Sequence, residues 1–258
     1  MTGDKVLLPA LAAGVFLAGW QLVILAGFFP HTLLPSPLEV LKGLAELERQ
    51  GVLVDHVSAS MYRFVAGYGL AVALGIPAGL MLGWYGWLGV ALDPLIQVLR
   101  PISPIAWIPL AILWFGTGDR PAIFIIFLAS FFPILLSTAA AVQHVDPLLT
   151  RMARNFGASP RQLLGTIVFP SAFPYITVGL HVALGTAWIH LVAGEMIAVR
   201  SGLGFLIVDA RNLLRTDLVI AAMVLIGLLG FTLDRLMRLV ERIMTARWGM
   251  AAGGEERA

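Results

Sequence analysis

Cysteine is absent from this chain of 258 residues, and charged residues make up only 12% of it. Without cysteine there are no disulfide bonds and no thiol chemistry. Soluble domains carry about 25% charged residues, so the low share here excludes an ordinary soluble domain. The net charge of +2 is too small to indicate a nucleic-acid partner.

A nucleotide-binding loop is missing as well. The sequence contains no G-x-x-x-x-G-K-[ST] motif, whose backbone amides and lysine hold the phosphates of ATP. The histidines also lack the nucleophile or the further ligands that an intramembrane enzyme or a metal site would need. We therefore predict no catalytic residue, no metal site and no cofactor in this chain. Energy for transport would have to come from a partner or from an ion gradient.

Long uncharged runs fill most of the chain, and the mean hydropathy is +0.90. Since a helix needs about 20 mostly apolar residues to cross a membrane, we expect an all-α polytopic membrane protein with about six transmembrane helices. The first run is too long for the core of a signal peptide, so we expect it to be retained. The spans are predicted near residues 7–29, 62–83, 91–115, 121–142, 171–195 and 216–237.

Proline and glycine predict local features of these spans. Pro77 in the second span, and Pro101, Pro104 and Pro109 in the third, are expected to interrupt the helices because proline removes a backbone donor. The third span is a candidate for lining a transport path, or it is simply kinked. Small residues at Gly75, Gly79 and Gly83 share one face of the second span and predict close packing against another helix.

The segment between the first two spans, residues 31–61, is expected to be an outer amphipathic segment. Ser36-Pro37-Leu38-Glu39 has the spacing of a capping box with proline in the first turn, and Gly51 offers a stop. Leu38, Leu41 and Ala45 would form its apolar stripe.

Basic residues set the expected orientation. Arginines cluster near the C-terminus, among them Arg235, Arg238 and Arg242, whereas Arg63 and Arg200 count as loop charges on the other side. This bias favours both termini in the cytoplasm, with residues 238–258 as a cytoplasmic tail.

Residues 145–170 cannot lie in lipid, because they carry three arginines and two helix-start signals. Asp146-Pro147 and Ser159-Pro160-Arg161-Gln162 predict helices near 147–156 and 160–168, with a turn at Gly157 between them and an end at Phe169-Pro170. This cytoplasmic loop could lie on anionic lipid, or it could insert into a groove of a cytosolic partner. The residues alone leave both readings open.

Here the chain resembles a family, from about Ser58 to Arg242. Ala153, Gly157, Ile167 and Pro170 fit the loop pattern Glu-Ala-Ala, three residues, Gly, nine residues, Ile-x-Leu-Pro of ABC importer permeases, although Arg151 replaces the glutamate. Two further segments resemble the permeases for nitrate, sulfonates, taurine and bicarbonate. They are Arg100-Pro101-Ile102-Ser103-Pro104 through Gly116, and Gly194-Glu195-Met196 with Gly202-Leu203-Gly204-Phe205.

The resemblance implies a single permease domain over 1–258 with the type I importer fold, located in a bacterial inner membrane. It also implies a second permease copy, most simply an identical one, two cytosolic ABC ATPase subunits that bind ATP and Mg²⁺, and a substrate-binding protein on the outer face. The cargo would be a small oxyanion. The residues implied to couple to the ATPase are Arg151, Ala153, Arg154, Gly157, Ala158, Ser159, Ile167 and Pro170.

Polar residues within spans are candidates for the transport path, because such residues usually face protein or water. Arg100 could attract an oxyanion, extend to the interface with lipid, or pair with Asp93. His181, Trp188 and Glu195 recur every seven residues and share one stripe with Thr177, whereas His190 points elsewhere and is expected to serve packing. The candidates are Arg100, Ser103, Trp107, His181, Trp188 and Glu195.

Glu195 is expected to act as a gate or brace rather than as an anion ligand, because a carboxylate repels an anion unless it is paired. Arg200 and Arg211 are the expected partners. The alternative to an ABC importer permease is a gradient-driven secondary transporter or channel, which would favour buried acidic residues for ion coupling and an inverted repeat.

Overall fold

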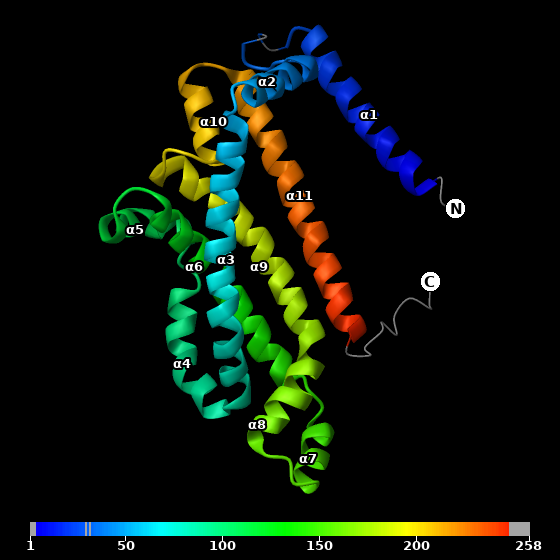
Figure 1. Ribbon diagram of the computed structural model, residues 1–258, viewed down its shortest axis with the longest axis vertical. Helices are drawn as coiled ribbons and strands as arrows, with labels where there is room; N and C mark the ends of the chain where they lie inside the picture. Colours follow the sequence, from blue (N-terminus) through cyan, green and yellow to red (C-terminus); the bar gives the residue numbers. More distant parts are fainter. Residues whose placement is uncertain (1–3, 29, 31, 248–258) are drawn as a thin grey trace. The chain divides into compact units, whose positions relative to one another are not determined.

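The computed structural model describes residues 4–28, 30 and 32–247, and all regular structure within them is helical. Figure 1 shows these helices coloured along the chain. In order they are α1 (Asp4–Leu25), α2 (Pro37–Arg49), α3 (Val52–Trp84), α4 (Gly86–Leu99), the 3-10 helix η1 (Pro104–Trp107), α5 (Ile108–Phe115), α6 (Asp119–Gln143), α7 (Pro147–Asn155), α8 (Pro160–Gln162), the π-helix η2 (Leu163–Val168), α9 (Phe169–Ala198), α10 (Leu203–Asn212) and α11 (Thr216–Arg247).

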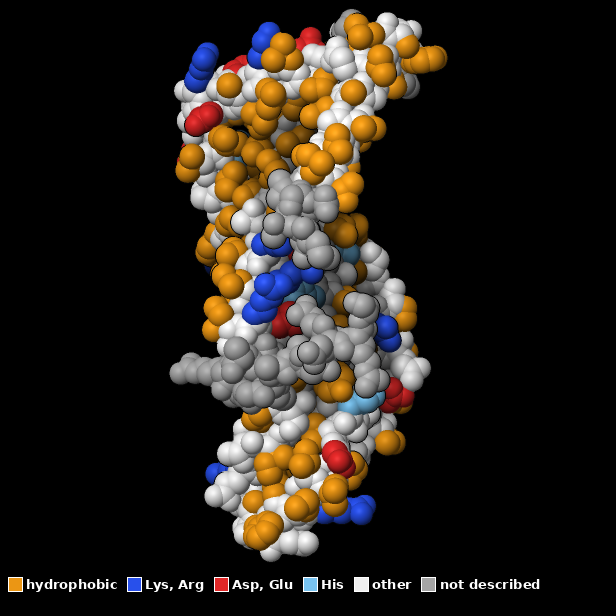
Figure 2. All heavy atoms as spheres, turned by 90° about the vertical axis from the view of Figure 1, so that its right-hand side faces the viewer, with side chains coloured by type: hydrophobic (Ala, Val, Ile, Leu, Met, Phe, Trp, Pro, Cys, Tyr) orange, Lys and Arg blue, Asp and Glu red, His pale blue; other side chains and the backbone are white. Residues whose placement is uncertain are grey.

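The six predicted spans are all present. Among the described residues, five helices are long and apolar enough to cross a membrane, and a sixth span forms if α4 and the η1–α5 segment count together across a bend of 79°. Their outward surfaces are apolar: Val65, Leu113 and Ile189 are each more than 60% exposed. Figure 2 shows many hydrophobic and few charged side chains on the visible face. Such surfaces are stable in lipid but not in water.

Four details differ from the predictions. Helix α3 begins at Val52, well before residue 62, and runs through Pro77 without a break. Helix α10 was not predicted, and α11 continues past residue 237 to Arg247. Residues 248–258 of the predicted tail lie outside the described part of the chain.

The contacts divide the chain into two compact units, and α3 and α11 contribute residues to both. Unit 1 contains residues up to Ser60 together with 200–228. In this unit the predicted capping box is confirmed: the Ser36 amide donates to the Glu39 carboxylate at 2.6 Å, and the Glu39 amide donates to Ser36 Oγ at 3.3 Å. Gly51 has a φ of 72°, as the predicted stop requires.

The face of α2 that packs within the protein is not the predicted apolar stripe. Leu38 and Leu41 are exposed, and the helix instead buries Val40, Gly43 and Leu47. Leu47 packs against residues that start α11 or lie in α10, among them Leu206 and Leu218. The sequence could not reveal this face, because α10 was not expected.

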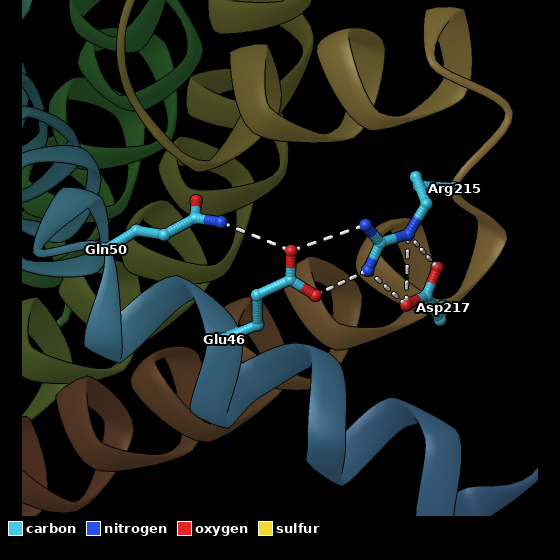
Figure 3. Close-up of polar contacts among 4 residues, drawn as sticks. All are labelled: Glu46, Gln50, Arg215 and Asp217. Carbon is cyan, nitrogen blue, oxygen red and sulfur yellow. Dashed lines mark hydrogen bonds and ion pairs between the residues drawn. The ribbon is translucent and has the colours of Figure 1, made fainter.

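Ion pairs join α2 to the start of α11 (Figure 3). The Arg215 guanidinium donates to Glu46 Oε2 at 2.7 Å and to Asp217 Oδ2 at 2.8 Å, and Gln50 donates to the same Glu46 carboxylate at 3.2 Å. The Arg215 hydrogen bonds lower the pKa of the Glu46 carboxyl, and hydrogen bonds to Asp217 and Glu46 raise the pKa of Arg215.

Unit 2 contains residues 61–199 and the rest of α11. Its glycines let α3 and α6 pack closely, as predicted. A Cβ atom on Gly79 would lie 2.6 Å from the Leu135 carbonyl oxygen of α6, and one on Gly83 would lie 2.7 Å from the Ala139 carbonyl oxygen. Gly75 meets Ile134 in the same way. Any larger side chain at these positions would push the helices apart.

Candidate functional site

The break in the third span opens a cavity in unit 2. Helix α4 ends at Leu99, the chain turns, and η1 resumes at Pro104. Pro104 and Pro109 fall in the first turns of η1 and α5, where a missing N–H costs nothing. The result is a cavity of about 630 Å³ between this turn, α6 and α9. Its wall is mostly apolar, and the polar or ionisable side chains in it are Arg100, Trp107, Ser137, Tyr175, Thr186 and His190.

Arg100 brings a positive charge to this wall. One of its three expected roles, an ion pair with Asp93, is not found. Asp93 Oδ2 instead accepts a hydrogen bond from Gln97 Nε2 at 2.6 Å. No ion pair or side-chain hydrogen bond of Arg100 occurs among the described residues. Its guanidinium is therefore open to a ligand at the edge of the cavity.

The other pathway candidates separate into two groups. Trp107 lines the cavity with Arg100, and Ser103 lies at the start of η1 beside the lining residues Ile102 and Pro104. His181, Trp188 and Glu195 are not among the cavity residues. They lie along a different face of α9, and Trp188 and Glu195 are buried there.

The buried face of α9 contacts α3 and α11. Trp188 meets Phe64 edge to face, with ring centroids 5.4 Å apart. A Cβ on Gly230 of α11 would lie 2.7 Å from Trp188 Nε1. Further along, Glu241 accepts a hydrogen bond from Thr177 Oγ1 at 3.0 Å and lies 3.5 Å from His181 Nδ1. The predicted stripe is real, and it faces the interior of the bundle.

Glu195 does not pair with Arg200 or Arg211 as predicted. It accepts a hydrogen bond from Arg63 Nη1 at 2.6 Å, and Arg63 Nη2 lies 2.7 Å from Asp119 Oδ1. Arg63 and Glu195 are buried, whereas the Asp119 side chain is half exposed. Arg63 was assigned to a loop, but it lies inside α3. Its only sequence signal was its position at the edge of an uncharged run.

These ion pairs connect three elements. Arg63 belongs to α3, Asp119 begins α6 and Glu195 lies near the end of α9. A backbone hydrogen bond from Gly118 to the Ala198 carbonyl, 3.0 Å long, joins the same ends of α6 and α9. This geometry is that of a brace at one end of unit 2, as expected for Glu195 although with a different partner.

The loop of residues 145–170 has the predicted start signals. Asp146 Oδ1 accepts from the Leu148 amide at 2.8 Å to start α7, and Gly157 adopts a φ of 81° after it. Ser159 and Gln162 form the predicted capping box. The hydrophobic side chains of this module, Leu148, Leu149, Met152 and Phe156, are all exposed.

The second helix of this loop does not end at Phe169-Pro170. Helix α8, the π-helix η2 and α9 follow one another without a gap, and together they run from Pro160 to Ala198 (Figure 1). The Phe169 amide donates to the Leu164 carbonyl, five residues back. The wider π turn accommodates the ring of Pro170, which would clash with the preceding turn of a regular α-helix.

Sequence comparison decides the family. The family described as "Binding-protein-dependent transport system inner membrane component" matches residues 72–246. The chain belongs to this family. It is the membrane permease subunit of an ABC importer, as the resemblance predicted.

Named relatives of this permease agree with that assignment. It is 40% identical to a putative ABC transporter permease protein of Methanocaldococcus jannaschii, covering 92% of this chain and 89% of the relative. It is 36% identical to the taurine transport system permease protein TauC of Escherichia coli, covering 90% and 86%. Identity to the nitrate import permease protein NrtB of a Synechocystis strain is 34%, covering 93% and 90%.

The permease also has a known fold. A structure of the MetNI methionine ABC transporter in an inward-facing conformation matches with a TM-score of 0.59, covering 75% of this chain and 98% of that one, at 19% identity. The predicted type I importer fold is confirmed.

Proposed function

We propose that this permease forms the path of an ATP-driven importer for a small oxyanion, such as taurine or another sulfonate, nitrate or bicarbonate. The observation that carries the proposal is Arg100, whose guanidinium has no partner among the described residues and lies at the wall of a cavity of about 630 Å³. A guanidinium binds sulfonate, nitrate and carboxylate oxygens by charge-assisted hydrogen bonds. The names of the taurine and nitrate relatives support the same class of cargo.

The loop module is proposed to transmit work from a cytosolic ATPase. Leu148 and Met152 on α7 and Phe156 at its C-cap present an exposed apolar surface, which favours insertion into a protein groove over solvation. Gly157 sets the turn, and Ile167 and Pro170 lie where the module continues into α9. The other residues proposed to couple to the ATPase lie on α7 or between α7 and α8, namely Arg151, Ala153, Arg154, Ala158 and Ser159. ATP and Mg²⁺ would bind to the ATPase, and a substrate-binding protein would deliver cargo on the other face of the membrane.

A second, identical permease copy is proposed to cover the cavity. Polar side chains lie in or beside this cavity on α4, at its C-cap and on α9, namely those of Asp93, Gln97, Arg100 and His190. Polar side chains in spans avoid lipid. A copy of the same chain would enclose them and complete the path. The proposed setting is a bacterial inner membrane, with lipid around the pair and both termini in the cytoplasm.

Reconstitution tests the proposal. The permease would be purified with its ATPase and binding protein, placed in liposomes, and assayed for uptake of taurine, ethanesulfonate, nitrate and hydrogencarbonate. We expect uptake of at least one anion only with ATP, and a large loss in Arg100→Gln that Arg100→Lys partly restores. Transport by the permease alone, without any ATPase, would instead favour a gradient-driven transporter or channel.

A further inference from the structure

The ring of His190 is fixed by a hydrogen bond to its own helix. Its Nδ1 lies 2.7 Å from the carbonyl oxygen of Thr186. A carbonyl oxygen can only accept, so Nδ1 must carry the hydrogen. In the neutral ring Nε2 is then unprotonated and can only accept a hydrogen bond. No partner of Nε2 occurs among the described residues.

His190 lines the same cavity as Arg100. The two side chains offer opposite chemistry to a bound molecule. The guanidinium of Arg100 offers only donors and a positive charge, whereas Nε2 of a neutral His190 offers only a lone pair. The remaining ionisable side chain in this wall is Tyr175, which can donate or accept.

An anion with no hydrogen to donate cannot use Nε2 of a neutral His190, because its oxygens and the nitrogen both carry lone pairs. Nitrate and plain alkanesulfonates belong to this class. Taurine carries an ammonium group beside its sulfonate, and hydrogencarbonate carries a hydroxyl. Each of these can place its oxyanion on a guanidinium and donate a hydrogen bond to an imidazole. The cavity is large enough for either, since pockets for small ligands span about 300–1,000 Å³.

We propose that this cavity selects an oxyanion that also carries a hydrogen-bond donor. Arg100 takes the anionic end, and Nε2 of His190 accepts the N–H or O–H. His190 is thus a residue that determines specificity rather than a packing residue. The inference rests on the proposed function, because it requires the cavity to be part of the path for an oxyanion.

The test compares two pairs of anions in the reconstituted importer, with the same binding protein and substrate well below saturation throughout, so that the uptake rates report discrimination. Taurine is paired with ethanesulfonate, and hydrogencarbonate with nitrate, since only the first of each pair has a donor. For the pair that is carried, we expect His190→Phe to lower the ratio of uptake rates about tenfold, the size of one hydrogen bond that involves a charged or strongly polar group. His190→Gln keeps an acceptor oxygen and should restore most of the ratio.

His181→Phe is the matched control. Its Nδ1 also meets the carbonyl oxygen four residues back, that of Thr177 at 3.3 Å, but His181 lies outside the cavity beside Glu241. We expect the ratio of uptake rates in His181→Phe to equal that of the wild type. Three outcomes would overturn the inference. His181→Phe could lose selectivity as well, His190→Phe could lower both uptake rates equally, or His190→Gln could fail to restore the ratio of uptake rates.

Uptake by the wild type distinguishes a failure of the selectivity from a failure of oxyanion import. If the wild type imports nitrate or ethanesulfonate as fast as its paired anion, the selectivity inference is wrong and oxyanion import stands. If it imports none of the four anions, the proposed function itself is wrong, and the inference falls with it. The two pairs also tell an aminosulfonate from hydrogencarbonate as the cargo.

Discussion

The buried ion pair between Arg63 and Glu195 makes a quantitative prediction about stability. Both side chains are at most 2% exposed, and Arg63 Nη1 lies 2.6 Å from Glu195 Oε1. Solvent and salt therefore screen this ion pair much less than one on the surface. Arg63→Met would leave the Glu195 carboxylate buried without its guanidinium. Removing one partner of a buried pair costs about 3–5 kcal/mol. Asp119→Asn should cost about 1 kcal/mol or less, because the Asp119 side chain is 49% exposed.

The double variant Arg63→Met with Glu195→Met separates this cost from packing. It removes both charges and keeps the volume, so it should recover most of the stability lost in Arg63→Met. Thermal unfolding of the purified permease in detergent, followed by tryptophan fluorescence, is the assay. For a chain of this size, about 3–5 kcal/mol corresponds to a midpoint roughly 6–20 °C lower.

The order of midpoints is decisive. We expect wild type and Asp119→Asn to be highest, the double variant next and Arg63→Met lowest. If the double variant is less stable than Arg63→Met, or if Arg63→Met and Asp119→Asn lose equal amounts, the charges do not form the brace inferred from their geometry.

Three further outcomes are expected. Gly79→Ala should destabilise the permease by about 1–3 kcal/mol, because its Cβ would collide with a backbone oxygen of α6. Gly69→Ala in the same helix meets nothing within 4 Å and should be neutral or stabilising; equal midpoints for the two variants would contradict the close approach. Gly157→Pro should uncouple ATP hydrolysis from uptake without affecting membrane insertion, since proline cannot adopt a φ of 81°, whereas normal uptake would argue against the turn as a coupling element. The hydrogen bonds from Arg215 lower the pKa of Glu46 in the folded state, so the ion pair stabilises the protein above the unfolded pKa of about 4.3 and stabilises it less as the pH falls. Glu46→Gln should therefore lower the unfolding midpoint near neutral pH and match the wild type in acid. A difference in midpoint that does not change with pH would refute this.

Local signals in the sequence predicted local structure well. The caps at Ser36, Asp146 and Ser159 act within three residues, so their side chains and spacing define each helix start without reference to the rest of the chain. The span count followed from hydropathy for the same reason. Glycine spacing also predicted the contact face of α3, because it depends only on the period of one helix.

Long-range partners were not predictable in this way. Arg63 and Glu195 are 132 residues apart in the chain, and no feature of the sequence around either residue predicts that they form an ion pair. The side of α9 that meets the cavity depends on how α6 and the turn before η1 pack against it. Sequence spacing found the stripe of Trp188 and Glu195, but it could not tell the bundle interior from the cavity wall, so His190 was assigned to packing.

The continuity of α8, η2 and α9 has a consequence for how such importers evolve. A helix of 39 residues is about 58 Å long. It follows directly on α7 and the turn at Gly157, which are proposed to contact the ATPase, and it carries the cavity residues Thr186 and His190 toward its other end. The segment proposed to contact an ATPase and the wall that contacts a cargo are therefore joined by one continuous helix. If this helix tilts to fit a new ATPase, the cavity wall that contacts the cargo shifts as well. Changes of ATPase partner and changes of cargo are therefore selected together.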